Sequence, residues 1–131
     1  MDKAAIKILV VEDEELLRDI LALVLSDEGY QVEIATNGEE AWEKLNDDSY
    51  DLLATDLFMP KMNGFELVLK VQRAFPGLKI IMISGGGKEV EAIDGNNVIT
   101  YQEQTAEVDV FLKKPYSIEL LLSRVEQALT S

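Results

Sequence analysis

Five short, mainly apolar runs recur along the chain, and each is followed by a polar or charged residue. The runs span residues 7–11, 31–35, 52–55, 78–83 and 110–113. Runs of this length, rich in Val, Ile and Leu, are typical of strands buried on both faces of a parallel sheet. The pattern therefore predicts five strands.

Helical periodicity fills most of the intervals between these runs. Leu17, Leu21 and Leu25 lie on one stripe of a first helix, which Gly29 ends. Residues 88–97 show no periodicity and are predicted to form a long loop. Further helices are predicted for residues 38–47, 65–75 and 98–107, the last short and weakly amphipathic, and from 117 to 129.

Strands that alternate with helices predict one α/β domain, a (βα)5 doubly wound parallel sheet with right-handed crossovers. The carboxyl ends of the strands meet at one edge of such a sheet, and ligands bind there. Polar side chains follow four of the predicted strands at that edge. They are Glu12 and Asp13, Asp56, Ser84 and Lys114.

Charge and composition narrow the classes of function. The 131 residues carry 12 basic and 25 acidic side chains, a net charge of −13, which repels phosphate backbones and argues against nucleic-acid binding. No apolar run approaches the roughly 20 residues of a membrane span. No cysteine is present, which suits a cytoplasmic location. We expect residues 1–131 to form one domain, with no output domain in this chain.

The absence of histidine is informative about chemistry. It rules out a histidine-based triad or a His-ligated zinc site within this chain. Any phosphohistidine must therefore come from a partner.

The carboxylates at the predicted edge suggest metal-assisted phosphoryl chemistry. Three carboxylates in one pocket repel one another, and a hard cation such as Mg²⁺, or Mn²⁺ in its place, relieves that repulsion. Asp56 can then attack phosphorus as a nucleophile. Lys114 and Ser84 can neutralise or donate hydrogen bonds to the phosphoryl oxygens.

Several sequence motifs resemble the receiver domains of two-component response regulators, in the order in which that family has them. They are residues 8–14, residues 35–41, residues 51–56, Met59-Pro60, Gly64 and Lys114-Pro115. The resemblance covers essentially the whole chain. It implies a flavodoxin-like sheet with strand order 2-1-3-4-5.

The resemblance also implies roles for single residues. Asp56 would accept a phosphoryl group, and Asp13, Asp56 and the Phe58 carbonyl oxygen would bind Mg²⁺, with Glu12 acting through a water. Lys114 would pair with Asp56 or with its phosphate, and the peptide bond from Lys114 to Pro115 would be cis. Ser84 and Phe111 would be the switch hydroxyl and the switch aromatic.

The same resemblance implies a histidine kinase or a histidine phosphotransfer protein as partner, and an output domain or effector. The domain would be a switch that assists its own phosphorylation and not an enzyme in the usual sense. Phe58 and Gly86 stand where the family positions a hydrolytic water, and neither side chain can orient one. We therefore expect slow self-dephosphorylation.

Two other classes of function remain open at this point. One is a Mg²⁺-dependent phosphatase of the haloacid-dehalogenase type, which also uses an Asp nucleophile but needs a second Asp where Phe58 stands. The other is an unphosphorylated interaction module with the receiver fold.

The sequence departs from the family pattern in two places. The interval between Ser84 and Lys114 is longer than usual for the family, and the common Gly-Ala before the last strand is missing. Both departures argue against a standard output dimer.

Overall fold

The structure is a computed structural model that describes residues 2–59, 61–84, 91–92 and 98–130. Its centre is a five-stranded parallel sheet with the order β2-β1-β3-β4-β8. The strands are β1 (Lys7–Val11), β2 (Gln31–Ala35), β3 (Leu52–Asp56), β4 (Lys79–Ser84) and β8 (Val110–Lys113). Counted within this sheet, the order is 2-1-3-4-5, so the predicted fold class is confirmed.

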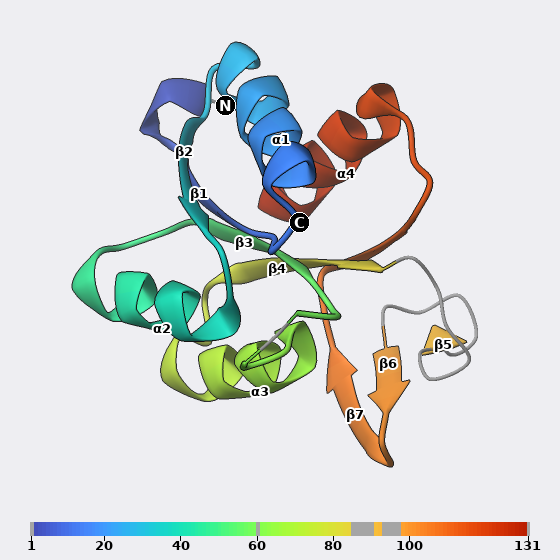
Figure 1. Ribbon diagram of the computed structural model, residues 1–131. Coiled ribbons are helices and arrows are strands. Elements are labelled where there is room, and N and C mark those ends of the chain that lie inside the picture. The colour runs from blue at the N-terminus through green and yellow to red at the C-terminus, as the bar shows by residue number, and fades with distance from the viewer. Residues whose placement is uncertain (1, 60, 85–90, 93–97, 131) are drawn as a thin grey trace.

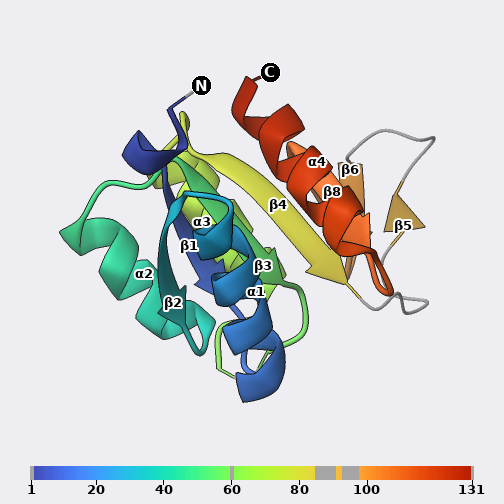
Figure 2. The same cartoon turned by 90° about the horizontal axis from the view of Figure 1, so that it is seen from above.

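Four α-helices of the described residues cover the two faces of this sheet (Figures 1 and 2). They are α1 (Glu15–Asp27), α2 (Gly38–Asp47), α3 (Gly64–Ala74) and α4 (Ile118–Thr130). α1 and α4 lie on one face, and α2 and α3 lie on the other (Figure 1). The side chains that precede α2 and α4 cap these helices. The Asn37 Oδ1 accepts a hydrogen bond from the Glu40 N–H at 2.9 Å, and the Ser117 Oγ accepts one from the Leu120 N–H at 3.0 Å, as expected for helix N-caps.

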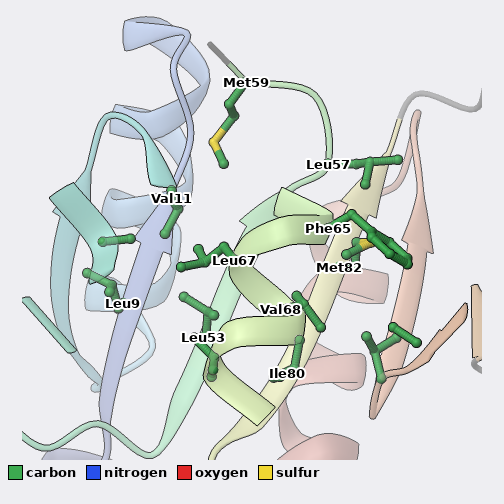
Figure 3. Close-up of a cluster of buried hydrophobic side chains, with 14 of the residues drawn as sticks. Leu9, Val11, Leu53, Leu57, Met59, Phe65, Leu67, Val68, Ile80 and Met82 are labelled. Atoms are coloured by element: carbon green, nitrogen blue, oxygen red, sulfur yellow. The ribbon is translucent and has the colours of Figure 1, made fainter. Parts of the chain in front are cut away.

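Each face of the sheet buries its own apolar cluster. Leu9, Leu53 and Met82 of the strands belong to one buried cluster with Phe65 and Val68 of α3 (Figure 3). On the opposite face, strand residues such as Ile8 and Ile81 pack with α1 and α4 residues. Burial of the central strands on both faces explains why their sequences are almost continuously apolar.

The predicted helix at residues 98–107 is wrong. This segment forms the antiparallel strands β6 (Val98–Tyr101) and β7 (Gln104–Glu107), which with β5 (Glu91–Ala92) make a second sheet of order β5-β6-β7. The hairpin lies on the same side as α3 (Figure 1). The fourth strand-helix unit of the predicted (βα)5 pattern therefore has β-structure in place of its expected helix, whereas the fifth unit, β8 followed by α4, is present as predicted.

The sequence of the hairpin explains this outcome. Val98, Ile99, Thr100 and Tyr101 are β-branched or aromatic, residue types that favour a pleated strand. Gln102 and its neighbour Glu103 have φ values of 48° and 64°, the left-handed pair that a two-residue hairpin turn requires. Ile99 and Ala106 face each other across the hairpin and are both buried.

Most of the loop predicted for residues 88–97 lies outside the described residues. Glu91 and Ala92 are the exception, because they pair with Thr100 and Ile99. Within the described part of the chain, no helix combines the length and the apolar character that crossing a membrane would require.

Candidate functional site

The carboxyl ends of β1 and β3 bring three acidic side chains together. The two strands are parallel neighbours, with Val11 opposite Thr55, so the residues that follow them lie side by side. Glu12, Asp13 and Asp56 each offer a carboxylate oxygen, and these oxygens lie within 4.8 Å of one another. We call these three residues the acidic cluster.

The backbone after β3 holds Asp56 in one place. Its Oδ1 accepts a hydrogen bond from the Leu57 N–H at 2.9 Å, and its carbonyl oxygen accepts from the Thr55 hydroxyl at 2.9 Å. The Gly64 N–H donates to the Leu57 carbonyl oxygen at 2.8 Å, which draws the start of α3 back onto the strand end. A Cβ at residue 64 would lie 2.0 Å from the Asp56 carbonyl oxygen. Only glycine allows this close approach.

Lys114, just beyond β8, places an ammonium group against the acidic cluster. Its Nζ lies 3.4 Å from the Glu12 Oε1 and 3.6 Å from the Asp56 Oδ2. Its backbone N–H donates to the Ser84 carbonyl oxygen at 2.8 Å, which ties the ends of β4 and β8 together. The Lys114–Pro115 peptide bond is cis, as the resemblance implied.

Burial raises the pKa values of Glu12 and Asp56. Glu12 is only 2% exposed. Burial, reinforced by repulsion from Asp56, raises the pKa of Glu12 to about 7, against the opposing effects of the Glu14 N–H and Lys114. Burial likewise raises the pKa of Asp56, although the Lys114 ammonium acts to lower it. Bringing these carboxylates together therefore has a cost that a bound proton or cation removes.

The donor set fits a hard divalent cation. Carboxylate oxygens are the ligands that such ions prefer, and the three acids outnumber the Lys114 ammonium beside them. Asp13 is exposed, while Glu12 is buried. An ion could therefore reach the acidic cluster from the side of Asp13.

The remaining predicted site residues lie around this centre. Ser84 ends β4 and is completely buried. Phe58 follows β3 with 40% of its surface exposed, and Phe111 is half-buried on β8. Gly86 lies outside the described residues. The structure therefore brings Glu12, Asp13, Asp56 and Lys114 into contact distance and places Ser84 at the end of the next strand.

Sequence reasoning missed two residues that border the site. Tyr101 and Asn63 line a hollow of about 330 Å³ together with Asp13, Phe58 and Met59. Asn63 is also the N-cap of α3, where its side chain accepts from the Glu66 N–H at 2.8 Å. The alternation of Ile99 and Tyr101 was a signal for a strand, but nothing in the sequence showed that Tyr101 would reach the site.

Comparison with known proteins agrees with this geometry. Residues 8–126 match the model of the response regulator receiver domain. Response regulator RR06 of Streptococcus pneumoniae is 34% identical over 121 residues, which cover 91% of this chain and 51% of that protein. The CpxR homolog of Haemophilus influenzae is 34% identical over 123 residues, 94% of this chain and 50% of that protein. The chain thus spans about half the length of these curated relatives.

Solved structures show the same architecture. A CheY-like receiver domain protein from Methanospirillum hungatei has a TM-score of 0.78 at 27% identity, covering 95% of this chain and 94% of that one. The response regulator TrrA from Thermotoga maritima, in complex with Mg(2+)-BeF, has a TM-score of 0.78 at 28% identity, covering 95% and 99%. With its acidic cluster at the carboxyl edge of a five-stranded parallel sheet, the chain belongs to the receiver domain family of two-component response regulators.

Proposed function

We propose that Asp56 is the phosphoacceptor of this receiver domain and takes its phosphoryl group from a phosphohistidine of a partner protein. The observation that carries the proposal is the convergence of the acidic cluster and the Lys114 ammonium at one strand edge. The partner would be a histidine kinase or a histidine phosphotransfer protein, because this chain contains no histidine.

The two oxygens of Asp56 have different surroundings, which suits one of them to attack. Oδ1 accepts the Leu57 N–H, whereas Oδ2 faces the Lys114 Nζ at 3.6 Å. In the transfer, an oxygen of Asp56 forms a bond to phosphorus while the bond from phosphorus to the imidazole nitrogen breaks and that nitrogen keeps the electron pair. Lys114 is placed to neutralise charge on the transferring group.

Mg²⁺ is the divalent ion that we propose for the acidic cluster, with Mn²⁺ able to replace it. Asp13, Asp56 and the Phe58 carbonyl oxygen would hold it, and Glu12 would act through a water. The ion supplies positive charge to the phosphoryl oxygens. The Mg(2+)-BeF complex of TrrA supports this choice by similarity.

The switch would use the buried end of β4. Ser84 lies on the strand next to β8, and its carbonyl oxygen binds the Lys114 N–H. We propose that the Ser84 hydroxyl moves toward the phosphoryl group and that Phe111 follows it inward. The modification would shift an equilibrium between two arrangements that the protein already has.

We further propose that the domain is a slow switch rather than an enzyme. The exposed ring of Phe58 cannot orient an attacking water, and neither can a glycine at position 86. Phe58 also argues against a phosphatase of the haloacid-dehalogenase type, because that class needs a second Asp at this position.

We propose a cytoplasmic location for the protein. We also propose that an output domain or a separate effector receives the signal, and the greater length of the relatives supports an output domain.

Phosphorylation with acetyl phosphate and intact-mass measurement tests the proposal. The wild type should gain one phosphoryl group with Mg²⁺ and none without it, and Asp56→Ala should gain none. Asp19→Ala, which removes an exposed carboxylate of α1, is the matched control and should behave as the wild type does. Stoichiometric labelling of Asp56→Ala would refute the assignment of the acceptor.

The proposed metal ligands predict an order of effects on Mg²⁺ affinity, measured by calorimetric titration. Asp13→Ala should weaken binding more than Glu12→Ala, because a direct ligand loses a bond while an indirect one loses a water-mediated contact. Glu14→Ala, the exposed neighbour, should have little effect. A larger loss for Glu12→Ala than for Asp13→Ala would reverse the two roles.

A further inference from the structure

Three aromatic rings form a line from the core to the edge of the phosphorylation site. Phe65 of α3 is buried, with 1% of its surface exposed. The Tyr101 ring of β6 packs against it, with centroids 5.5 Å apart and planes tilted by 47°. The Phe58 ring then meets Tyr101 edge-on, at 6.0 Å and 71°. Both separations lie in the range that favours aromatic pairs.

The outer ring of this line borders the approach to Asp56. Phe58 lines the same hollow as the exposed side chain of Asp13. A carboxylate oxygen of Asp13 lies within 4.8 Å of one of Asp56. The hollow therefore lies beside the acidic cluster, and the Phe58 ring and Asp13 both border it.

An exposed phenylalanine next to a loop would ordinarily change rotamer freely. Here the Tyr101 ring packs edge-on against Phe58, and Tyr101 is itself held in place. It pairs with Gln104 across the hairpin, and Ile99, two residues earlier, is completely buried. The Gln72 Nε2 donates to the Glu107 carbonyl oxygen, which fastens β7 to α3.

We propose that Tyr101 is a positioning residue that keeps the Phe58 ring over the entrance to the phosphorylation site and so protects the phosphorylated Asp56 from water. The proposal rests on Asp56 being the phosphoacceptor. In the hydrolysis that it slows, the oxygen of a water bonds to phosphorus as the bond from phosphorus to the Asp56 oxygen breaks. Asp56 leaves as a carboxylate, and inorganic phosphate keeps both protons of the water. The β-hairpin, which replaces the predicted helix, would thus contribute directly to the lifetime of the signal.

The test follows decay of the phosphorylated protein after acetyl phosphate is removed, in the presence of Mg²⁺. Tyr101→Ala should decay about fivefold faster than the wild type, the size of effect that loss of one aromatic contact can have on a rotamer population. Tyr101→Phe should restore the wild-type rate, because the ring and not the hydroxyl makes the contacts with Phe58 and Phe65. Gln104→Ala is the matched control, since it changes the exposed partner of Tyr101 in the hairpin without removing a ring.

A double variant separates the positioning role from general loosening of the fold. In a Phe58→Ala background, Tyr101→Ala should cause no further acceleration, because the ring it positions is gone. Tyr101→Leu, which keeps an apolar side chain against Phe65, should also accelerate decay if Tyr101→Ala fails to fold. The proposal would be overturned if decay is unchanged in both Tyr101→Ala and Tyr101→Leu, or if Tyr101→Ala accelerates decay equally with and without the Phe58 ring. A wild type that takes up no phosphoryl group would instead refute the proposed function, and this inference with it.

Discussion

Glu12 shows how strongly a single side chain at the site feels its surroundings. The carboxyl group is almost completely buried, with Asp56 nearby and only the Glu14 N–H and the Lys114 ammonium acting to favour its charged form. Its raised pKa means that the folded protein binds a proton there more tightly than the unfolded chain does. In the absence of a cation, the ionised acidic cluster is therefore a source of instability.

The pKa of Glu12 predicts a pH-dependent effect of Glu12→Gln on the metal-free protein. Because the folded pKa is about 7 and the ordinary value is 4.5, the wild type loses stability as pH rises through this interval. The variant lacks that loss. Its free energy of unfolding should exceed that of the wild type by up to about 3 kcal/mol at pH 8 and match it below about pH 4.

Urea denaturation at several pH values with a chelator present measures this difference. Glu14→Gln, which neutralises an exposed acid two residues further along the chain, is the control and should not show this gain in stability at pH 8. Saturating Mg²⁺ should stabilise the wild type more than Glu12→Gln. A variant that is less stable than the wild type at pH 8 without metal would show that the ionised carboxylate stabilises the fold.

At the scale of elements, the hairpin β6-β7 is an integral part of the core. Ile99 is completely buried and Ala106 is 5% exposed, and both belong to the apolar cluster that contains Val71 of α3 and Met82 of β4. Val108, which follows β7, belongs to the same cluster. The hairpin therefore covers part of this face of the sheet, the role expected of the predicted helix.

This packing predicts a large destabilisation by Ile99→Ala. Removing most of a fully buried side chain should lower the free energy of unfolding by about 2–4 kcal/mol, through lost burial and the cavity that remains. Thr105→Ala, at an exposed position of β7, should cost less than about 1 kcal/mol. Denaturant unfolding of both variants makes the comparison. Equal, small effects would mean that the hairpin does not contribute to the core.

For the whole molecule, charge is distributed differently at the two ends of the sheet. At the amino end, the Lys7 ammonium lies 2.7 Å from the Glu33 Oε2 and also contacts the Asp48 carboxylate. Hydrogen bonds to Asp48 and Glu33 raise the pKa of Lys7. The carboxyl end instead carries the acidic cluster, where three carboxyl groups lie near one ammonium group, that of Lys114. The net charge of −13 adds self-repulsion throughout the molecule.

This excess charge predicts that monovalent salt stabilises the protein. Screening shortens the reach of charge repulsion from about 30 Å at 0.01 M to about 10 Å at 0.1 M ionic strength. Thermal unfolding with a chelator should therefore show a midpoint that rises with NaCl. Choline chloride, whose cation is too large for the acidic cluster, should give the same rise. A midpoint that falls with salt, or that responds to NaCl alone, would contradict a global charge effect.

The sequence by itself determined the parallel sheet and the position of its reactive edge. Short apolar runs rich in Val, Ile and Leu that alternate with helical segments are typical of strands covered on both faces, and the polar residues that follow them then emerge at the carboxyl edge. Glu12, Asp56 and Lys114 could be assigned to one site for that reason, without knowledge of any side-chain contact. The observed strand order and the distances within the acidic cluster agree with this reasoning.

Tertiary structure alone decided the conformation of residues 98–107 and the neighbours of Phe58. The segment's weak helical pattern competed with β-branched residues and a turn at Gln102 and Glu103 that needs positive φ. Such short segments take the conformation that buries their apolar side chains, here Ile99 against the core beside α3. The contact of Tyr101 with Phe58 joins residues 43 positions apart, across two elements whose relative placement no local pattern encodes.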